Sequence, residues 1–188
     1  MIEFRFDIKS TTQAAAMFLK LNGQDRPMKY LGLVKLLYMA DREALRRMDQ
    51  PITGDKYCSM DFGPVLSEVY DLIKGNRLVP EEDRAFWAEH ISDRQDHEIT
   101  LLKDPGNSDL CDEFENIISE VYSKYGNMDR FDLADLTHWF PEWQYPNGSS
   151  IPIPAEKILE ALGKDAQEIA EIESEVAAER YLDQILNV

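Results

Sequence analysis

The chain has 188 residues, and its 20 lysine and arginine residues are outnumbered by 36 aspartate and glutamate residues, which gives a formal net charge of −16. The 44% of hydrophobic residues can bury the core of one domain, which excludes extensive disorder, and no apolar run approaches the roughly 20 residues that span a bilayer. The acidic balance disfavours nucleic acid as a partner and favours a basic protein surface, while two distant cysteines fit the cytoplasm.

Two long helices are predicted in the first fifty residues. The S-T-T-Q stretch at residues 10–13 has the pattern of a capping box, so the first helix is expected from there to residue 22. The second helix is expected to run from Pro27, whose fixed φ suits a first helical turn, to about residue 48. Three basic side chains of this helix are expected to reach solvent: Lys35, Arg42 and Arg46.

A short strand and a third helix are expected next. The strand is predicted near residues 52–62, because Gly54 and Gly63 mark turns and the residues between them alternate in polarity as strand residues do. Pro64 is expected to open the third helix, since proline is favoured in a first helical turn, and the helix is expected to end at residue 75.

A β-hairpin is predicted from residues 86–91 and 98–102, two segments of strand-like composition that a polar stretch separates. His90 and His97 have charged neighbours in this segment, so both are expected to face solvent. Ser108 is then expected to cap a helix that runs to residue 125.

The last third of the chain is predicted to be helical at residues 129–138, 154–162 and 164–186, with a loop at residues 145–150. The final helix carries seven acidic residues against Lys164 and Arg180. The sequence therefore predicts a mainly α fold, a compact domain of about six to seven helices with a small β element.

Asp41 is the most unusual residue of the second predicted helix. At 100° per residue it lies between Leu37 and Leu45 in the apolar stripe, where a carboxylate is costly unless it is hydrogen-bonded or paired. One interpretation is a general base or a metal ligand. The favoured interpretation is a buried acceptor that holds the segment at residues 51–63 or the region of His138 in place.

His138 is the second candidate for chemistry, and no metalloprotease, serine-hydrolase or Cys–His motif surrounds it. A structural role is favoured for it, so changes at Asp41 and His138 are expected to affect folding. Trp139, Phe140 and Trp143 have no basic residue among them and are expected in the core. A metal-assisted hydrolase that uses Asp41 and His138 remains the alternative, although it needs a third protein ligand.

Four motifs resemble the Panacea domain of the SocA- and GepA-like antitoxins: residues 35–42, 51–57, 63–65 and 136–143. The signature residues in these motifs are Lys35, Leu37, Tyr38, Asp41, Pro51, Thr53, Gly54, Tyr57, Gly63, Pro64, Val65, Thr137, His138 and Trp143. The resemblance covers residues 10–145 and implies a mainly helical domain over residues 1–150. It implies a scaffold role for these residues, with no catalytic set and no cofactor.

The resemblance also implies a function. Members of the family are antitoxins of two-gene toxin–antitoxin systems in bacteria and phages, and they neutralise the toxin by protein–protein contact. The SocA branch also delivers its toxin to a cytosolic protease as an adaptor. An acidic chain suits this function, because toxins that act on RNA or nucleotides tend to present basic surfaces. A transcriptional repressor is a further possibility that the net charge disfavours.

Residues 151–188 lie beyond the resemblance and are expected to form a C-terminal helical extension that packs on the domain or binds a partner. One interpretation of the acidic final helix is an ordinary solvated helix. The other is a surface for toxin-specific contacts, on which Glu171, Glu175 and Glu179 steer a basic partner.

Overall fold

The computed structural model describes residues 1–23 and 25–186, and it contains eight helices and five short strands in that part of the chain. The helices are α1 (Ile8–Asn22), α2 (Tyr30–Met48), α3 (Ser67–Lys74), α4 (Glu81–His90), α5 (Asp112–Tyr125), α6 (Arg130–Thr137), α7 (Ala155–Ala161) and α8 (Ala166–Leu186). The strands are β1 (Met28–Lys29), β2 (Tyr57–Met60), β3 (Gly63–Leu66), β4 (Glu98–Ile99) and β5 (Ile151–Ile153). The prediction of a mainly α fold with a small β element is confirmed.

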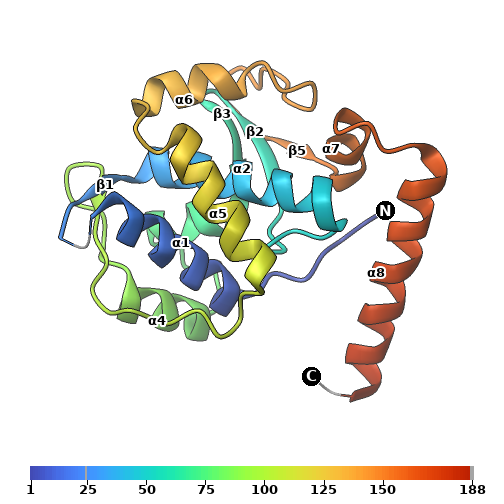
Figure 1. Ribbon diagram of the computed structural model, residues 1–188, viewed down its shortest axis with the longest axis horizontal. Coiled ribbons are helices and arrows are strands. Elements are labelled where there is room, and N and C mark those ends of the chain that lie inside the picture. Colours follow the sequence, from blue (N-terminus) through green and yellow to red (C-terminus); the bar gives the residue numbers. More distant parts are fainter. Residues whose placement is uncertain (24, 187–188) are drawn as a thin grey trace.

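Helix α2 is the centre of the molecule, with α1, α5, α6 and strand β3 packed around it (Figure 1). Its residues from Gly32 to Asp41 are all buried, Leu37 among them, so the helix is covered on every side rather than along one stripe. A helix surrounded in this way positions whatever polar groups it carries inside the core.

The larger sheet is antiparallel, in the order β3-β2-β5. Tyr57 pairs with Leu66 on one side and with Ile153 on the other, so β2 is the central strand. Tyr57 and Ser59 face the core and Cys58 is half-buried, as the alternating pattern predicts. The predicted single strand near residues 52–62 is thus shorter, and a second strand, Gly63–Leu66, follows it directly.

Proline does not open the second and third helices, contrary to prediction. Residues Met28–Lys29 beyond Pro27 pair with Ile99 and Glu98, so α2 begins only at Tyr30. Pro64 lies in strand β3 opposite Ser59, and α3 begins at Ser67. Strand β3 is at the edge of its sheet, where a residue without an N–H group is tolerated.

The predicted hairpin at residues 86–91 and 98–102 is wrong in its first strand. Residues Glu81–His90 form helix α4, which begins with three acidic residues, and negative charge in a first turn stabilises a helix. Strand β4 pairs with β1 instead, and an isolated bridge between Ile91 and Leu101 is what joins the two predicted segments. His90 is buried, with Nδ1 2.8 Å from the carbonyl oxygen of Phe86, whereas His97 is exposed as predicted.

Two of the predicted helix caps are also wrong. Helix α1 begins at Ile8, and its cap is Asp7, whose carboxylate accepts from the backbone N–H groups of Lys9 and Ser10 at 2.8 and 3.0 Å. The hydroxyl of Ser10 instead donates to the carbonyl oxygen of Asp109. Helix α5 begins at Asp112, after the predicted cap at Ser108.

Helix α8 runs along the edge of the molecule and projects beyond it (Figure 1). Its buried residues are Ile172 and Val176, and ion pairs connect Arg180 to Glu3 and Asp183 to Arg5, so the N-terminal segment holds the helix. In the described residues, none of the helices combines the length and the apolar character needed to cross a membrane.

The cap of α1 gives a first prediction. Replacing Asp7 by alanine is expected to lower the free energy of unfolding by about 0.5–2 kcal/mol, because two N–H groups lose their acceptor. Asp7→Asn keeps the acceptor and is expected to retain most of the stability. Urea unfolding of both variants measures the difference, and equal loss in the two variants would show that capping is not the reason.

Candidate functional site

The polar signature residues meet around strands β2 and β3, where α2 and the segment after α6 cover them. Helix α2 supplies Lys35, Tyr38 and Asp41, each fully or almost fully buried. A buried polar group costs free energy unless it is hydrogen-bonded, so the partners of these three side chains define the site.

Asp41 accepts four hydrogen bonds, three from the segment that precedes β2 and one from the first residue of that strand. One carboxylate oxygen accepts from the N–H groups of Ile52 and Thr53, both at 3.0 Å. The other accepts from the Thr53 hydroxyl at 2.5 Å and from the Tyr57 hydroxyl at 3.2 Å. Burial raises the pKa of Asp41 to about 6, and the hydrogen bonds oppose that rise in pKa. This carboxylate therefore fastens residues 52–57 to helix α2.

Asp55 is a second buried carboxylate, which the sequence analysis missed. It accepts from the N–H groups of Glu68 and Val69, both at 2.9 Å, in the first turn of α3. Because those N–H groups have no partner within the helix, Asp55 caps α3 from a distant segment. Burial raises the pKa of Asp55 to about 7. The Thr53 hydroxyl accepts from the Asp55 N–H group and so connects the two carboxylates.

Lys35 is buried, and the prediction that it reaches solvent is wrong. Its ammonium group donates to the carbonyl oxygen of Pro64 at 2.7 Å, and burial lowers the pKa of Lys35 to about 7. Gly63 makes room for this contact, because a Cβ atom there would lie 2.9 Å from Lys35 Nζ and 2.3 Å from Thr137 Oγ1. Gly63 also has φ +90°, a conformation that favours glycine.

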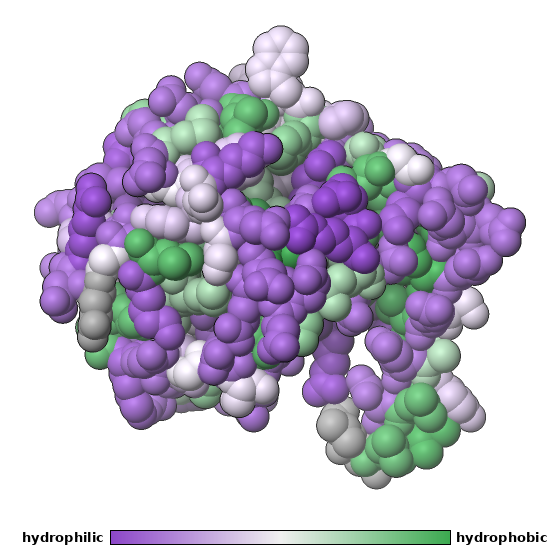
Figure 2. Space-filling view, in the orientation of Figure 1, coloured by the Kyte–Doolittle hydropathy of each residue, from purple (hydrophilic) through white to green (hydrophobic). Residues whose placement is uncertain are grey.

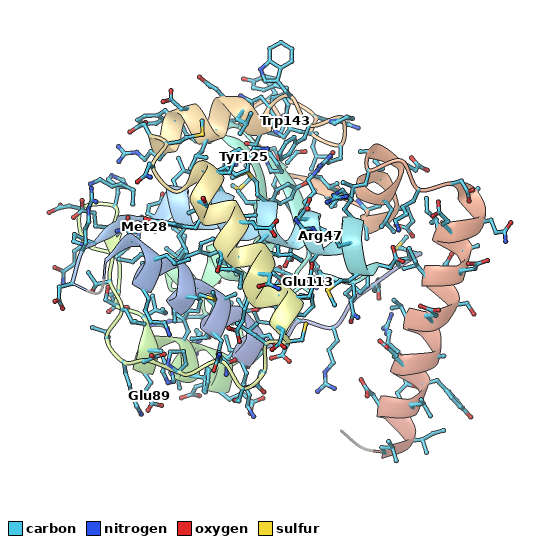
Figure 3. The ribbon with its side chains drawn as sticks, in the orientation of Figure 1. Met28, Arg47, Glu89, Glu113, Tyr125 and Trp143 are labelled. Atoms are coloured by element: carbon cyan, nitrogen blue, oxygen red, sulfur yellow. The ribbon has the colours of Figure 1, made fainter. Side chains whose placement is uncertain are left out.

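The segment after α6 fastens the turn between β2 and β3 from outside. His138 Nε2 lies 3.0 Å from the carbonyl oxygen of Asp61, and the Trp143 indole N–H donates to the carbonyl oxygen of Met60 at 3.1 Å. The His138 and Trp143 rings contact each other, with centroids 4.3 Å apart. Trp143 lies beside α6 (Figure 3). Both side chains are thus directed at backbone groups of the hairpin.

Glu142 is another buried acid that the sequence analysis missed. It accepts from the Tyr38 hydroxyl at 2.9 Å and from Arg42 Nε at 2.7 Å. Burial and the adjacent carboxylate raise the pKa of Tyr38 well above its usual range. Arg42 also lies over the Phe140 ring, so its side chain is mostly covered rather than free in solvent as predicted. Trp139, expected in the core, is instead 85% exposed.

The remaining signature residues shape the backbone of this region. Gly54 has φ +66°, and a Cβ atom there would lie 1.8 Å from the carbonyl oxygen of Arg5, which no other residue tolerates without a backbone shift. Pro51 is buried beside it, and Val65 pairs with Cys58 across the sheet.

The geometry gives these groups structural partners rather than a shared reaction centre. Both oxygens of Asp41 accept hydrogen bonds from residues 52–57, while His138 faces a backbone carbonyl. Within residues 1–23 and 25–186, no group of three or more His, Cys, Asp or Glu side chains is arranged to hold a metal ion. The third ligand that a hydrolase built on Asp41 and His138 requires is therefore not found in this part of the chain.

The three glutamates of the predicted partner surface lie on α8, outside the network of buried polar groups. Glu171, Glu175 and Glu179 are all exposed on that helix. Glu171 accepts a hydrogen bond from Gln167, and in the described residues none of the three forms an ion pair.

Comparison with protein families gives one match. The family described as antitoxin SocA-like, Panacea domain, matches residues 33–144, which is more than half of the chain. The match includes α2 from residue 33 onward, the β2–β3 hairpin and the segment after α6. Comparison with curated proteins and with solved structures gives no match.

The buried carboxylate gives a second prediction. Asp41→Ala is expected to lower the free energy of unfolding by on the order of 1–3 kcal/mol, because buried donors lose their acceptor. His138→Ala is also expected to be destabilising, because the carbonyl oxygen of Asp61 loses its donor and the Trp143 ring loses a contact. Asp93, which is exposed, provides the control, since Asp93→Ala is expected to unfold like the parent. Thermal and urea unfolding measure the stability of each variant. Parent-like stability of Asp41→Ala would contradict the structural role of Asp41.

The buried lysine gives a third prediction, on pH dependence. Between about pH 7 and pH 9.5 the unfolded chain still protonates Lys35 while the folded chain does not, so stability is expected to rise with pH by about 1–3 kcal/mol. Lys35→Met is expected to lack this rise, whereas Lys9→Met, at an exposed position, is expected to keep it. Urea unfolding across this pH range tests the prediction, and identical pH profiles for the parent and Lys35→Met would contradict it.

Proposed function

Because the chain belongs to the family of SocA-like antitoxins with a Panacea domain, we propose that it neutralises a co-encoded toxin by direct protein–protein contact in the cytoplasm. The family is one of antitoxins, which implies a toxin as the partner. The match to residues 33–144 is the single observation that carries this proposal.

The polar groups of the core support a binding function rather than catalysis. Asp41, Asp55, Lys35 and Glu142 each have partners within the fold, so their polar atoms are occupied in holding α2, the hairpin and α3 together. A rigid domain of this kind suits recognition, because a preformed surface loses less conformational entropy when it binds.

We place the toxin contact on the exposed acidic and apolar residues of α8, of which Glu175 and Glu179 also line a cavity between this helix and the domain. At 100° per residue, Glu171 and Glu175 fall within the arc that the apolar residues at the end of the helix span, and Glu179 lies at the edge of that arc. Those apolar residues are 55–66% exposed: Tyr181, Leu182, Ile185 and Leu186. Figure 2 shows a hydrophobic patch at the projecting end of α8, the part of the helix that carries Leu182, Ile185 and Leu186.

This face combines two means of binding a basic partner. Exposed carboxylates raise the association rate by attracting the partner over a distance of about a Debye length. The apolar residues at the tip provide area that becomes buried in the complex, and burial of that kind lowers the dissociation rate. Charge and apolar area on one exposed helix thus fit a protein with a basic surface beside an apolar groove.

Co-expression tests the proposal. The reading frame next to this one is expected to encode a small protein that arrests growth, and this chain is expected to restore growth when both are expressed. Purified chain is also expected to inhibit the purified toxin without any protease, which distinguishes direct inhibition from delivery to a cytosolic protease. Equal growth arrest with and without this chain would refute the proposal.

The surface of α8 gives a fourth prediction. Replacing Glu171, Glu175 and Glu179 by lysine is expected to lower the association rate with the toxin by about tenfold at low salt and to weaken its salt dependence, because steering by rim charges is lost. Stopped-flow mixing at two salt concentrations measures the rates, and the melting temperature is expected to change little.

A second triple variant, with the same change in net charge at positions outside α8, is the matched control. Lysine at Glu82, Asp93 and Asp135, which are exposed residues outside α8, is expected to alter the association rate less. Equal effects of the two triple variants would mean that only net charge matters. A variant without residues 164–188 that stays folded and neutralises as well as the parent would place the interface elsewhere on the domain.

A further inference from the structure

A cavity of about 490 Å³ opens between the first turn of α2, the β2–β3 turn, α3 and α6. Its volume falls within the range of small-molecule sites, roughly 300–1,000 Å³. No residue of α8 lines this cavity, so it is distinct from the surface to which the toxin contact is assigned.

Aromatic rings form much of the wall of this cavity. Phe62 and Phe131 face each other with ring centroids 6.3 Å apart, and they are 56% and 49% exposed. Tyr30 stacks on His97 with centroids 5.9 Å apart. Large rings that stay exposed in a folded domain offer faces on which a planar group can stack.

Two basic side chains lie among these rings. Lys74 Nζ is 3.0 Å from the Tyr30 hydroxyl oxygen, 4.8 Å from the Tyr30 ring centroid and 5.1 Å from that of Tyr70. The Arg130 guanidinium lies 4.7 Å from the centroid of Phe131. Both side chains line the cavity.

In the described part of the chain, Lys74 and Arg130 form no ion pair, although acidic residues outnumber basic ones almost two to one. By contrast, Lys20 and Arg47 each pair with carboxylates. The cavity therefore has local positive charge in an acidic protein, and charges farther away than about 8 Å are largely screened at physiological salt.

One acidic group also lines the cavity. Asp61 Oδ1 accepts from the backbone N–H group of Gly148 at 3.0 Å. This hydrogen bond holds the carboxylate at the rim, where its second oxygen is available to accept from an N–H group of a ligand.

We propose that this cavity binds a nucleotide, a planar ring that carries phosphate groups. The ring stacks against Phe62 or Phe131, the two exposed rings, and the phosphate groups accept hydrogen bonds from Lys74 and Arg130. Asp61 accepts from a ring or amino N–H group. Binding rests on these side chains, because the chain has no glycine-rich phosphate loop.

Calorimetric titration of the full chain with ADP and with GDP tests the proposal. At least one of the two is expected to bind at one site per chain, and more weakly as salt is raised. Inorganic pyrophosphate and adenosine are each expected to bind at least about tenfold more weakly, because each offers only half of the contacts.

Variants locate the site. Lys74→Ala and Arg130→Ala are each expected to weaken binding about tenfold, since each removes a charge-assisted hydrogen bond. Phe62→Ala is expected to weaken it by a similar factor through lost stacking. Lys9→Ala and Lys157→Ala remove exposed charges outside the cavity and are expected to bind like the parent. Thermal melts confirm that each variant is folded.

Three outcomes would overturn the proposal. One is no saturable binding of either nucleotide at millimolar concentration. Another is pyrophosphate binding as tightly as ADP and GDP, which would mean an anion site without ring recognition. The third is parent-like binding by both Lys74→Ala and Arg130→Ala. The titration contains no toxin, so a failure to bind nucleotide would not contradict the antitoxin function. Likewise, a failure to neutralise a toxin would not contradict nucleotide binding.

Discussion

The fold depends on one buried carboxylate. Asp41 is fully buried on α2, and its four hydrogen bonds hold residues 52–57 against that helix. Those residues in turn place Asp55 where it caps α3, and they lead directly into β2. An irregular segment that carries unpaired N–H groups is stable inside a core only if a polar side chain satisfies them. Asp41 is that side chain, so the position of the hairpin and of α3 follows from it.

A second set of contacts fastens the same hairpin from the opposite side. Lys35 donates to the carbonyl oxygen of Pro64 in β3, while the side chains of His138 and Trp143 contact the carbonyl oxygens of Asp61 and Met60. Glu142 joins the segment after α6 to Tyr38 and Arg42 of α2. These groups lie inside residues 33–144, the part that matches the family. A network in which each member has a partner specifies one arrangement of its elements, which is the property that a recognition scaffold needs.

Periodicity identified Asp41 from the sequence, because a carboxylate in an apolar helical stripe is conspicuous. It could not identify Asp55 or Glu142, which lie in irregular segments where no period distinguishes inside from outside. The same limit explains Lys35, whose burial requires the Pro64 carbonyl oxygen 29 positions away in sequence. Local composition favours a strand at residues 86–91. The acidic first turn of α4 and the pairing of β4 with β1 instead favour a helix up to His90.

Net charge and local charge describe different properties of this molecule. The value of −16 governs the field at a distance and favours a basic partner, which is the basis for assigning the exposed carboxylates of α8 to toxin binding. At the cavity, however, Tyr30, Lys74 and Phe131 come together from distant parts of the sequence. Only the fold reveals that Lys74 and Arg130 lie there without an ion pair to any other described residue. Because salt screens the distant acids more than the adjacent cations, the two surfaces can recognise ligands of opposite charge within one acidic chain.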